Sequence, residues 1–388
     1  MKSFVQISLI SVLFQGGYLA DATGSYIVTL RSLTEAKILD DHLARVQSEI
    51  DSAQHSREKN KINYEYRTVL KGYSAVFTDE VLAKVKAMSE VEDVEEDQGG
   101  SFAVIQKDAP WGLGRLSSPN LPLGNSQSLT YEYDHEPSAG EGVDVYVVDS
   151  GISTGVLDFE ERANWGVNFV TDDEFDVNDH GTHVAGIVGS KTYGVAKKST
   201  MIAVKVGDGK DPVLKSSLIA GVDWAVKDKK VGRGCVINIS LALSLSKVLN
   251  RAAGNGVDLG CVVVAAAGNS NKDACNFSPA SELKVITVGA TDIKDVRADF
   301  SNWGKCVTLF APGVDILSTT FYGFDHRSES GTSMAAPHVA GLAAIVLSKN
   351  KNYTPADVLK EIIEHATKHV KTKNGKESRD KLVSSKGL

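Results

Sequence analysis

The chain has 388 residues, of which 42% are hydrophobic and 23% charged, and its formal net charge is −7. This length and composition are typical of a soluble globular protein with two or three domains and a sizeable core. The negative charge argues against nucleic acids and anionic membranes as partners, and four cysteines allow one or two bridges but no disulfide scaffold.

The first segment, Met1–Ala22, has the pattern of a secretory signal. Lys2 supplies the positive start, Phe4–Phe14 is mostly apolar, and Ala20 and Ala22 are small residues suited to cleavage. The alternative is a short membrane anchor, but the apolar run is shorter than the roughly 20 residues that a span needs. We therefore expect a secreted, extracellular protein without a membrane partner, in a compartment where disulfides persist.

The next block predicts a small α+β domain with a ferredoxin-like sheet, because strand-like and helix-like stretches follow in the order β-α-β-β-α-β. The predicted elements are Tyr26–Leu30, Glu35–Ser56, Ile62–Leu70, Gly72–Asp79, Val81–Val91 and Val91–Asp97. Residues Gln98–Asp108 lack periodicity and predict a connector that a protease can cut.

From Ala109 on, apolar strand-like runs alternate with helix-like segments. The predicted strands are Val143–Val148, Met201–Val206, Cys235–Leu241, Cys261–Ala267, Val285–Ala290 and Val307–Phe310. The predicted helices are His180–Gly189, Val213–Val226, Ser246–Asp258, Ser333–Leu347 and Thr354–Ala366. Continuous apolar strands between helices indicate an α/β fold with a buried parallel sheet and helices on both faces. Sites in such sheets lie beyond the carboxyl ends of the strands.

Three short motifs carry the residue types of nucleophilic catalysis: VYVVDSGI contains Asp149, HGTHVAG contains His180 and GTSMAAPHVAG contains Ser333. A serine hydroxyl needs an imidazole to take its proton, and the imidazole needs a carboxylate to fix its tautomer. Each residue also has a structural alternative, since aspartate and serine often cap turns and helices. A metal site is disfavoured, because His183 follows His180 by three residues, whereas the H-E-x-x-H zinc motif spaces its histidines by four and adds a glutamate.

A fourth motif, AAAGNSN, places Asn269 just after a small-residue strand, where its amide can donate to a developing oxyanion. With this motif the chain resembles the subtilisin-like serine proteases, and the segments WGLGRLSS, TYGVAKKS, NFSPAS, VITVGATD, ADFSNWG and LFAPGVDILST resemble the proteinase K branch. The resemblance covers roughly residues 109–366. It implies an endopeptidase with Ser333 as nucleophile, His180 as base and Asp149 as its orienting carboxylate. Asn269 would stabilise the oxyanion.

The segments YIVTL, KGYSAVFTDEVLAKV and VEDVEED resemble the inhibitory pro-region of the same proteases. The resemblance implies an autoprocessed zymogen with a signal at 1–22, a pro-region at 23–103 and a peptidase domain at 104–388. The pro-region would act as an intramolecular inhibitor, and the enzyme would act as a monomer on proteins and peptides. An independent accessory domain is the alternative for the pro-region.

The substrate groove departs from the family pattern. By resemblance Ser240, Leu241 and Ala242 form one edge, near Ala266 and Gly268, but SLALSLS stands where the branch reads S-L-G-G. On the opposite edge KDPV replaces N-G-S-G, so a proline removes one backbone donor. The family's specificity rules are therefore in doubt here, and neutral variation in a tolerant loop is the alternative.

No cofactor is expected. The branch commonly has a calcium-ligating aspartate where this chain has Thr308, and a hard dication needs carboxylate oxygens, so calcium binding at that position is doubtful.

Cys275 and Cys306 match cysteines that occur together in the vacuolar proteinase B-like members, which implies a bridge and makes the vacuole an alternative location. Cys235 and Cys261 each open a core strand and can equally be buried free thiols. The chain has three glycosylation sequons. Asn352 and Asn276 are the candidate sites, whereas Asn238 lies in a predicted core strand.

Two other functions compete with the endopeptidase. A catalytically silent homologue acting as a binding protein is supported only by the altered groove. A nucleotide-binding protein is disfavoured, because no GxxxxGK[ST] motif follows a strand.

Overall fold

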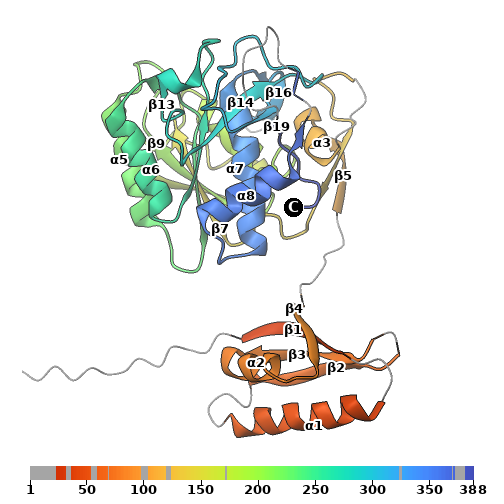
Figure 1. Cartoon of the computed structure of the whole chain (residues 1–388). Coiled ribbons are helices and arrows are strands. Elements are labelled where there is room, and N and C mark those ends of the chain that lie inside the picture. The colour runs from red at the N-terminus through yellow and green to blue at the C-terminus, as the bar shows by residue number, and fades with distance from the viewer. Residues whose placement is uncertain are drawn as a thin grey trace, which may run out of the picture. The chain divides into compact units, whose positions relative to one another are not determined.

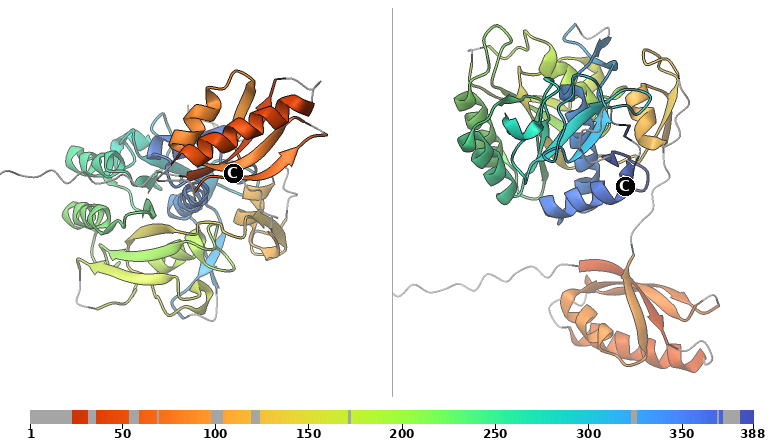
Figure 2. Two further views of the ribbon diagram at one scale, coloured as in Figure 1. Left: turned by 90° about the horizontal axis from the view of Figure 1, so that it is seen from below. Right: turned by 45° about the horizontal axis from the view of Figure 1, so that its top comes forward.

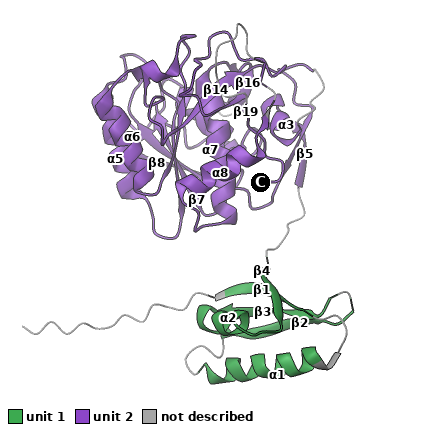
Figure 3. Ribbon diagram, viewed as in Figure 1, with its two compact units in different colours: residues 1–100 green, residues 101–388 purple. Residues whose placement is uncertain are grey.

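The computed structural model describes residues 23–31, 36–53, 59–68, 70–97, 104–118, 124–170, 173–322, 326–368, 370–371 and 381–388. The chain divides into two compact units, residues 1–100 and 101–388 (Figure 3). The predicted signal and residues 98–103 of the predicted connector lie outside the described residues. Among the described residues, no helix is both long and apolar enough to cross a membrane.

The first unit has the predicted order of elements. They are β1 (Thr23–Leu30), α1 (Ala36–Ser52), β2 (Lys61–Tyr66), β3 (Gly72–Thr78), α2 (Asp79–Lys86) and β4 (Val91–Glu96). The strands form one antiparallel sheet in the order β2-β3-β1-β4, the ferredoxin-like arrangement. Strand β2 ends at Tyr66, earlier than predicted, because Tyr66 pairs with Gly72 and the chain must turn between them.

A nine-stranded sheet forms the centre of the second unit, in the order β18-β19-β15-β14-β12-β10-β7-β9-β8 (Figure 1). From β8 to β19 all neighbours are parallel, and β18 is antiparallel to β19. The strands are β7 (Val143–Asp149), β8 (Ala163–Asn168), β9 (Thr200–Lys205), β10 (Gly234–Ile239), β12 (Val262–Ala266), β14 (Ile286–Thr291), β15 (Leu309–Pro312), β18 (Thr367–Lys368) and β19 (Lys381–Leu382).

Helices cover both faces of this sheet, as the apolar strands predicted (Figures 1 and 2). They are α3 (Trp111–Ser117), α4 (His180–Gly189), α5 (Lys215–Asp228), α6 (Lys247–Asp258), α7 (Thr332–Lys349) and α8 (Pro355–His365). Side chains of β7 alternate between the two faces. Val145 and Val147 belong to the core under α4, α7 and α8, whereas Tyr146 and Val148 belong to the core under α5 and α6.

Short pairs of strands lie outside the main sheet. They are β5 (Val104–Ala109) with β6 (Tyr131–His135), β11 (Leu243–Ser244) with β13 (Phe277–Ser278), and β16 (Ile316–Thr319) with β17 (His326–Glu329). Two short 3-10 turns are η2 (Leu157–Phe159) and η3 (Ala274–Asn276). The prediction that residues 104–108 are connector was wrong. They form β5, because β6 offers them a backbone partner.

Two disulfides lie in the second unit. Cys275 bonds Cys306, the pair that the resemblance implied. Cys235 bonds Cys261, with 4.7 Å between their Cα atoms. The sequence left the state of these two cysteines open, and the structure excludes the alternative of buried free thiols. Strands β10 and β12 are parallel neighbours with Val236 opposite Val262, so the cysteines one residue earlier also lie opposite each other.

Candidate active site

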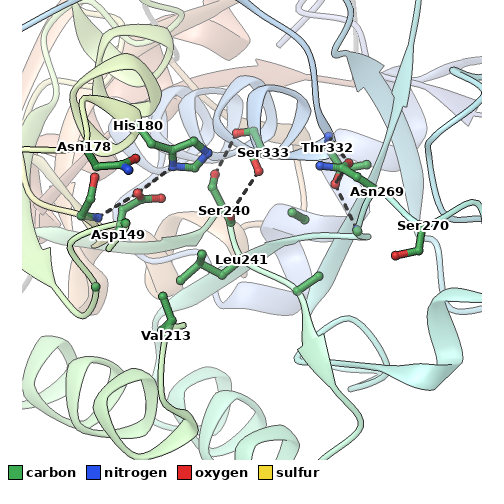
Figure 4. Close-up of a pocket in the computed structure, with 16 residues that line it drawn as sticks. Asp149, Asn178, His180, Val213, Ser240, Leu241, Asn269, Ser270, Thr332 and Ser333 are labelled. Atoms are coloured by element: carbon green, nitrogen blue, oxygen red, sulfur yellow. Dashed lines mark hydrogen bonds and ion pairs between the residues drawn. The ribbon is translucent and has the colours of Figure 1, made fainter. Parts of the chain in front are cut away.

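The four residues predicted for catalysis line one cleft of about 450 Å³ at the carboxyl ends of the central strands (Figure 4). Asp149 ends β7, and Asn269 lies three residues past β12. His180 opens α4, and Ser333 is the second residue of α7. The parallel sheet therefore brings together side chains that are up to 184 residues apart in the sequence.

Asp149 holds the imidazole of His180. The Nδ1 atom of His180 lies 2.7 Å from Oδ1 of Asp149, and Asp149 is only 3% exposed. Burial acts to lower the pKa of His180, but the charge and hydrogen bond of Asp149 outweigh it, so that the pKa is raised. With its Nδ1 facing the carboxylate, the ring keeps Nε2 available to exchange a proton.

A second carboxylate, Asp176, fixes the start of α4 and was missed in the sequence. It is fully buried. Its Oδ2 accepts hydrogen bonds from the backbone N–H of Thr182 at 2.9 Å and from the Thr182 hydroxyl at 2.6 Å. Its Oδ1 accepts from the backbone N–H groups of Asn178 and Asp179. Asp176 thus satisfies donors at the helix start, and its charge also acts to raise the pKa of His180.

Ser333 and Ser240 hydrogen-bond each other in both directions. The hydroxyl of Ser333 donates to the backbone carbonyl of Ser240 at 3.0 Å, and the hydroxyl of Ser240 donates to the backbone carbonyl of Ser333 at 2.8 Å. Asn238, which is buried in β10, donates from Nδ2 to the Ser240 hydroxyl at 2.9 Å. These bonds fix the start of α7 against the segment that follows β10.

Thr332 sets the orientation of Asn269. Its backbone N–H and its hydroxyl both donate to Oδ1 of Asn269, at 2.9 and 2.8 Å. Because the amide oxygen accepts both bonds, the Nδ2 donor faces the other way. A Cβ built on Gly331 would lie 3.2 Å from this Nδ2, so a side chain there would crowd the amide.

The backbone that carries Asn269 is held by the buried Asn302. The Nδ2 atom of Asn302 donates to the carbonyl of Ala267, and its Oδ1 accepts from the N–H of Ser270. Gly268, between them, has φ of +101°, a conformation that residues with a side chain rarely adopt. Sequence reasoning assigned no role to Asn302, although it lies in the segment ADFSNWG, because the backbone groups that it binds are distant in the chain.

The five residues predicted to bind substrate also line the cleft, which brings Ser240, Leu241 and Ala242 opposite Ala266 and Gly268. Of the opposite edge, Val213 lines the cleft together with Gly207 and Gly209. In Figure 4 Leu241 and Val213 lie near each other, and both are packed against the core cluster under α5 and α6.

The structure also places the residues that were considered for metal binding. His183 is fully buried, and its Nε2 lies 3.1 Å and 2.9 Å from the backbone carbonyls of Ile316 and Arg327. Burial lowers the pKa of His183 to about 3.

At the position where calcium was considered, the hydroxyl of Thr308 accepts a hydrogen bond from the backbone N–H of Thr287. Within the described residues no cluster of three or more His, Cys, Asp or Glu can hold a metal ion.

The glycosylation candidates differ in exposure. Asn352 and Asn276 are exposed, whereas Asn238 is fully buried and donates to Ser240. Only the first two are accessible to a modifying enzyme in the folded chain.

Comparisons with known proteins agree with this architecture. Residues 140–383 match the model of the subtilase family, and residues 25–101 match that of the peptidase inhibitor I9 family. The chain is 39% identical over 387 residues to alkaline protease 2 of Aspergillus fumigatus, and this match covers 88% of the present chain and 77% of the relative. It is 38% identical over 385 residues to the subtilisin-like serine protease pepC of Aspergillus niger, and this match covers 88% of the present chain and 71% of the relative. Among solved structures, a cold adapted subtilisin-like serine proteinase matches with a TM-score of 0.66 and 39% identity, over 72% of this chain and 98% of the other.

Proposed function

The chain belongs to the subtilase family, and we propose that it is a secreted serine endopeptidase that hydrolyses proteins through Ser333, His180 and Asp149. The observation that carries this assignment is the 2.7 Å contact between Nδ1 of His180 and Oδ1 of Asp149, in the cleft that Ser333 also lines. A carboxylate that orients a base, together with a serine nucleophile in the same cleft, is the set of groups that serine-dependent hydrolysis of a peptide bond uses.

The first half of the reaction forms an acyl-enzyme. The Ser333 hydroxyl leaves the carbonyl of Ser240 by rotation about its Cα–Cβ bond and gives its proton to Nε2 of His180. Its oxygen then attacks the peptide carbonyl carbon, and Asp149 stabilises the imidazolium that results. The C–N bond breaks as His180 returns the proton to the leaving amine. In the second half water replaces the amine, and the same proton transfers release the acid and restore the Ser333 hydroxyl.

Two donors stabilise the charge that develops on the carbonyl oxygen. One is Nδ2 of Asn269, because its amide oxygen is held by Thr332. The other is the backbone N–H of Ser333, which lies in the first turn of α7, where N–H groups have no intrahelical acceptor. The positive end of the α7 dipole favours the same negative charge.

The first unit serves, in this proposal, as the pro-region, since residues 25–101 match a peptidase inhibitor family. It would inhibit the enzyme until it is cut off between the pro-region 23–103 and the peptidase domain 104–388. Export through the signal Met1–Ala22 leads to the extracellular space, with the vacuole as the alternative. The mature enzyme acts as a monomer on protein and peptide substrates, carries glycans on Asn352 and Asn276, and needs no calcium at Thr308.

A single preparation tests the proposal. The protein is purified from the medium of an expressing cell, its N-terminal residue and mass are determined, and it is treated with a phosphonyl reagent that reacts with activated serines. We expect a chain that starts near Val104 and carries one adduct on Ser333. A folded, unprocessed protein without an adduct would support the silent homologue instead. Fractionation of the same cells separates the extracellular from the vacuolar location.

A further inference from the structure

Ala242 and Gly268, which both line the cleft, lie close to each other. A Cβ built on Gly268 would lie 3.1 Å from the Cβ of Ala242, which is closer than two carbon atoms normally pack. The Cα atom of Gly268 is one carbon–carbon bond from that built atom, so it lies within about 4.7 Å of the Ala242 methyl. The methyl group of Ala242 therefore lies close to the backbone of the opposite wall.

This gap is too small for a large side chain. An aromatic ring that is packed between two walls needs about 7 Å between the wall atoms, twice an ordinary carbon–carbon contact. The walls cannot separate easily. Asn302 holds the backbone on both sides of Gly268, and the reciprocal bonds between Ser240 and Ser333 hold the segment that leads to Ala242. A glycine in place of Ala242 would remove the methyl that closes the gap.

The direction of the reaction decides which substrate residue meets this gap. The leaving amine must face His180, because His180 returns its proton. His180 and Asn269 lie on opposite sides of Ser333 (Figure 4). The residue whose carbonyl is attacked therefore extends toward the side of Asn269, where Ala242, Ala266 and Gly268 form the walls.

We propose that Ala242 restricts this enzyme to cutting after small residues, such as glycine, alanine and serine. This inference rests on the proposed endopeptidase function and adds its substrate class. Ala242 would act as a size filter, since it has no group that takes part in bond making or breaking.

The test is a series of fluorogenic peptides that differ only in the residue before the cut: glycine, alanine, leucine and phenylalanine. The mature enzyme should turn over the alanine peptide with kcat/KM at least about 10-fold above that of the phenylalanine peptide, since a clash of this size costs one to two orders of magnitude. Ala242→Gly should shift that ratio toward phenylalanine by about 10-fold or more. A control is Ser244→Gly, which also introduces a glycine two residues away but at an exposed position outside the residues that line the cleft, and which should leave the ratio unchanged.

The outcomes separate the two proposals. If the processed enzyme cleaves every peptide and prefers phenylalanine or leucine, or if Ala242→Gly leaves the ratio unchanged, the size filter is wrong while the endopeptidase function stands. If the processed protein cleaves none of the peptides and Ser333 does not react with the phosphonyl reagent, the proposed endopeptidase function is wrong, and so is the proposed size filter. Sequencing the products of an unfolded protein digest gives a second reading, because the cuts should follow small residues and move to larger ones in Ala242→Gly.

Discussion

The hydroxyl of Ser333 donates its hydrogen bond to the backbone carbonyl of Ser240, 3.0 Å away. The proposed nucleophile is therefore held by the wall that would bind substrate. A substrate that pairs with this wall competes for the same carbonyl. Substrate binding and release of the hydroxyl toward His180 are thus coupled, which agrees with the general finding that catalytic hydrogen bonds tighten only when substrate is bound.

The triad should behave as one unit. We expect Ser333→Ala and His180→Ala each to reduce kcat on the order of 10⁶-fold, the size of the effect in subtilisin, and the double variant to lose little more. The measurement is kcat on one peptide with all variants supplied as mature protein. Near-normal turnover by Ser333→Ala, or losses that multiply in the double variant, would contradict the assignment.

Asn269→Ala should lower kcat by roughly 10²- to 10³-fold with little change in KM, as removal of the corresponding amide does in subtilisin. Thr332→Val keeps the shape of residue 332 but removes the hydroxyl that holds the amide oxygen. It should lower kcat by less than Asn269→Ala, and adding it to Asn269→Ala should cost little more. An effect of either substitution on KM alone argues against a role in the transition state.

The acid limb of kcat/KM should report His180, since only the neutral imidazole accepts a proton. Asp176 acts to raise the pKa of His180 and Arg327 to lower it. Asp176→Asn should therefore move the acid limb to lower pH, and Arg327→Gln should move it to higher pH. The two profiles are measured on one substrate, after a thermal melt shows that each variant is folded. Shifts in the same direction would show that these charges do not act through His180.

Maturation should require the enzyme's own nucleophile. We expect a cut between about Ser101 and Val104 in the active protein and an uncut form in Ser333→Ala, because the segment that follows the pro-region must reach the cleft if the pro-region seats its C-terminal end there. Both are expressed in a host without other proteases, and their N-termini are sequenced. Correct processing of Ser333→Ala under these conditions rules out self-cleavage.

Calcium should matter little at Thr308. A chelator is expected to leave the Tm of the unmodified protein nearly unchanged, whereas Thr308→Asp should make Tm rise with calcium concentration, since a ligand that binds only the native state stabilises it by mass action. Thr308→Asn is the uncharged control and should not respond. A large drop in Tm of the unmodified protein with chelator would reveal a calcium site elsewhere.

Much of the fold follows from the sequence because its central strands are continuous apolar runs. Helix α4 spans the predicted His180–Gly189, and the central strands agree with their predictions to within two residues at each end. Strand β8 was missed, since ANWGVN lies at the edge of the sheet, is mostly not buried and has no continuous apolar run. Strand β5 was missed because its pairing depends on a partner over 20 residues away.

The residues of the site also differ in how well the sequence predicts them. Asp149, His180, Ser333 and Asn269 lie in short motifs that can be recognised on their own. The residues that hold these four in place could not be predicted, because their hydrogen-bond partners come from other parts of the chain. Asn302 lies more than 30 residues from the backbone groups it binds. Of these residues, Asp176 could more easily have been predicted from the sequence, since an acidic residue shortly before a predicted helix start is a known capping signal.

The two disulfides divide the cleft into a covalently constrained part and an unconstrained part. The bridge Cys235–Cys261 encloses the edge that contains Ala242, and Cys275–Cys306 encloses Asn302, which holds the opposite wall. The triad lies outside both loops. Loops of 26 and 31 residues each contribute roughly 3 to 4 kcal/mol to stability. Reduction would therefore lower the stability of the whole second unit, so the walls and the catalytic residues that these walls hold both depend on a compartment that keeps the disulfides oxidised.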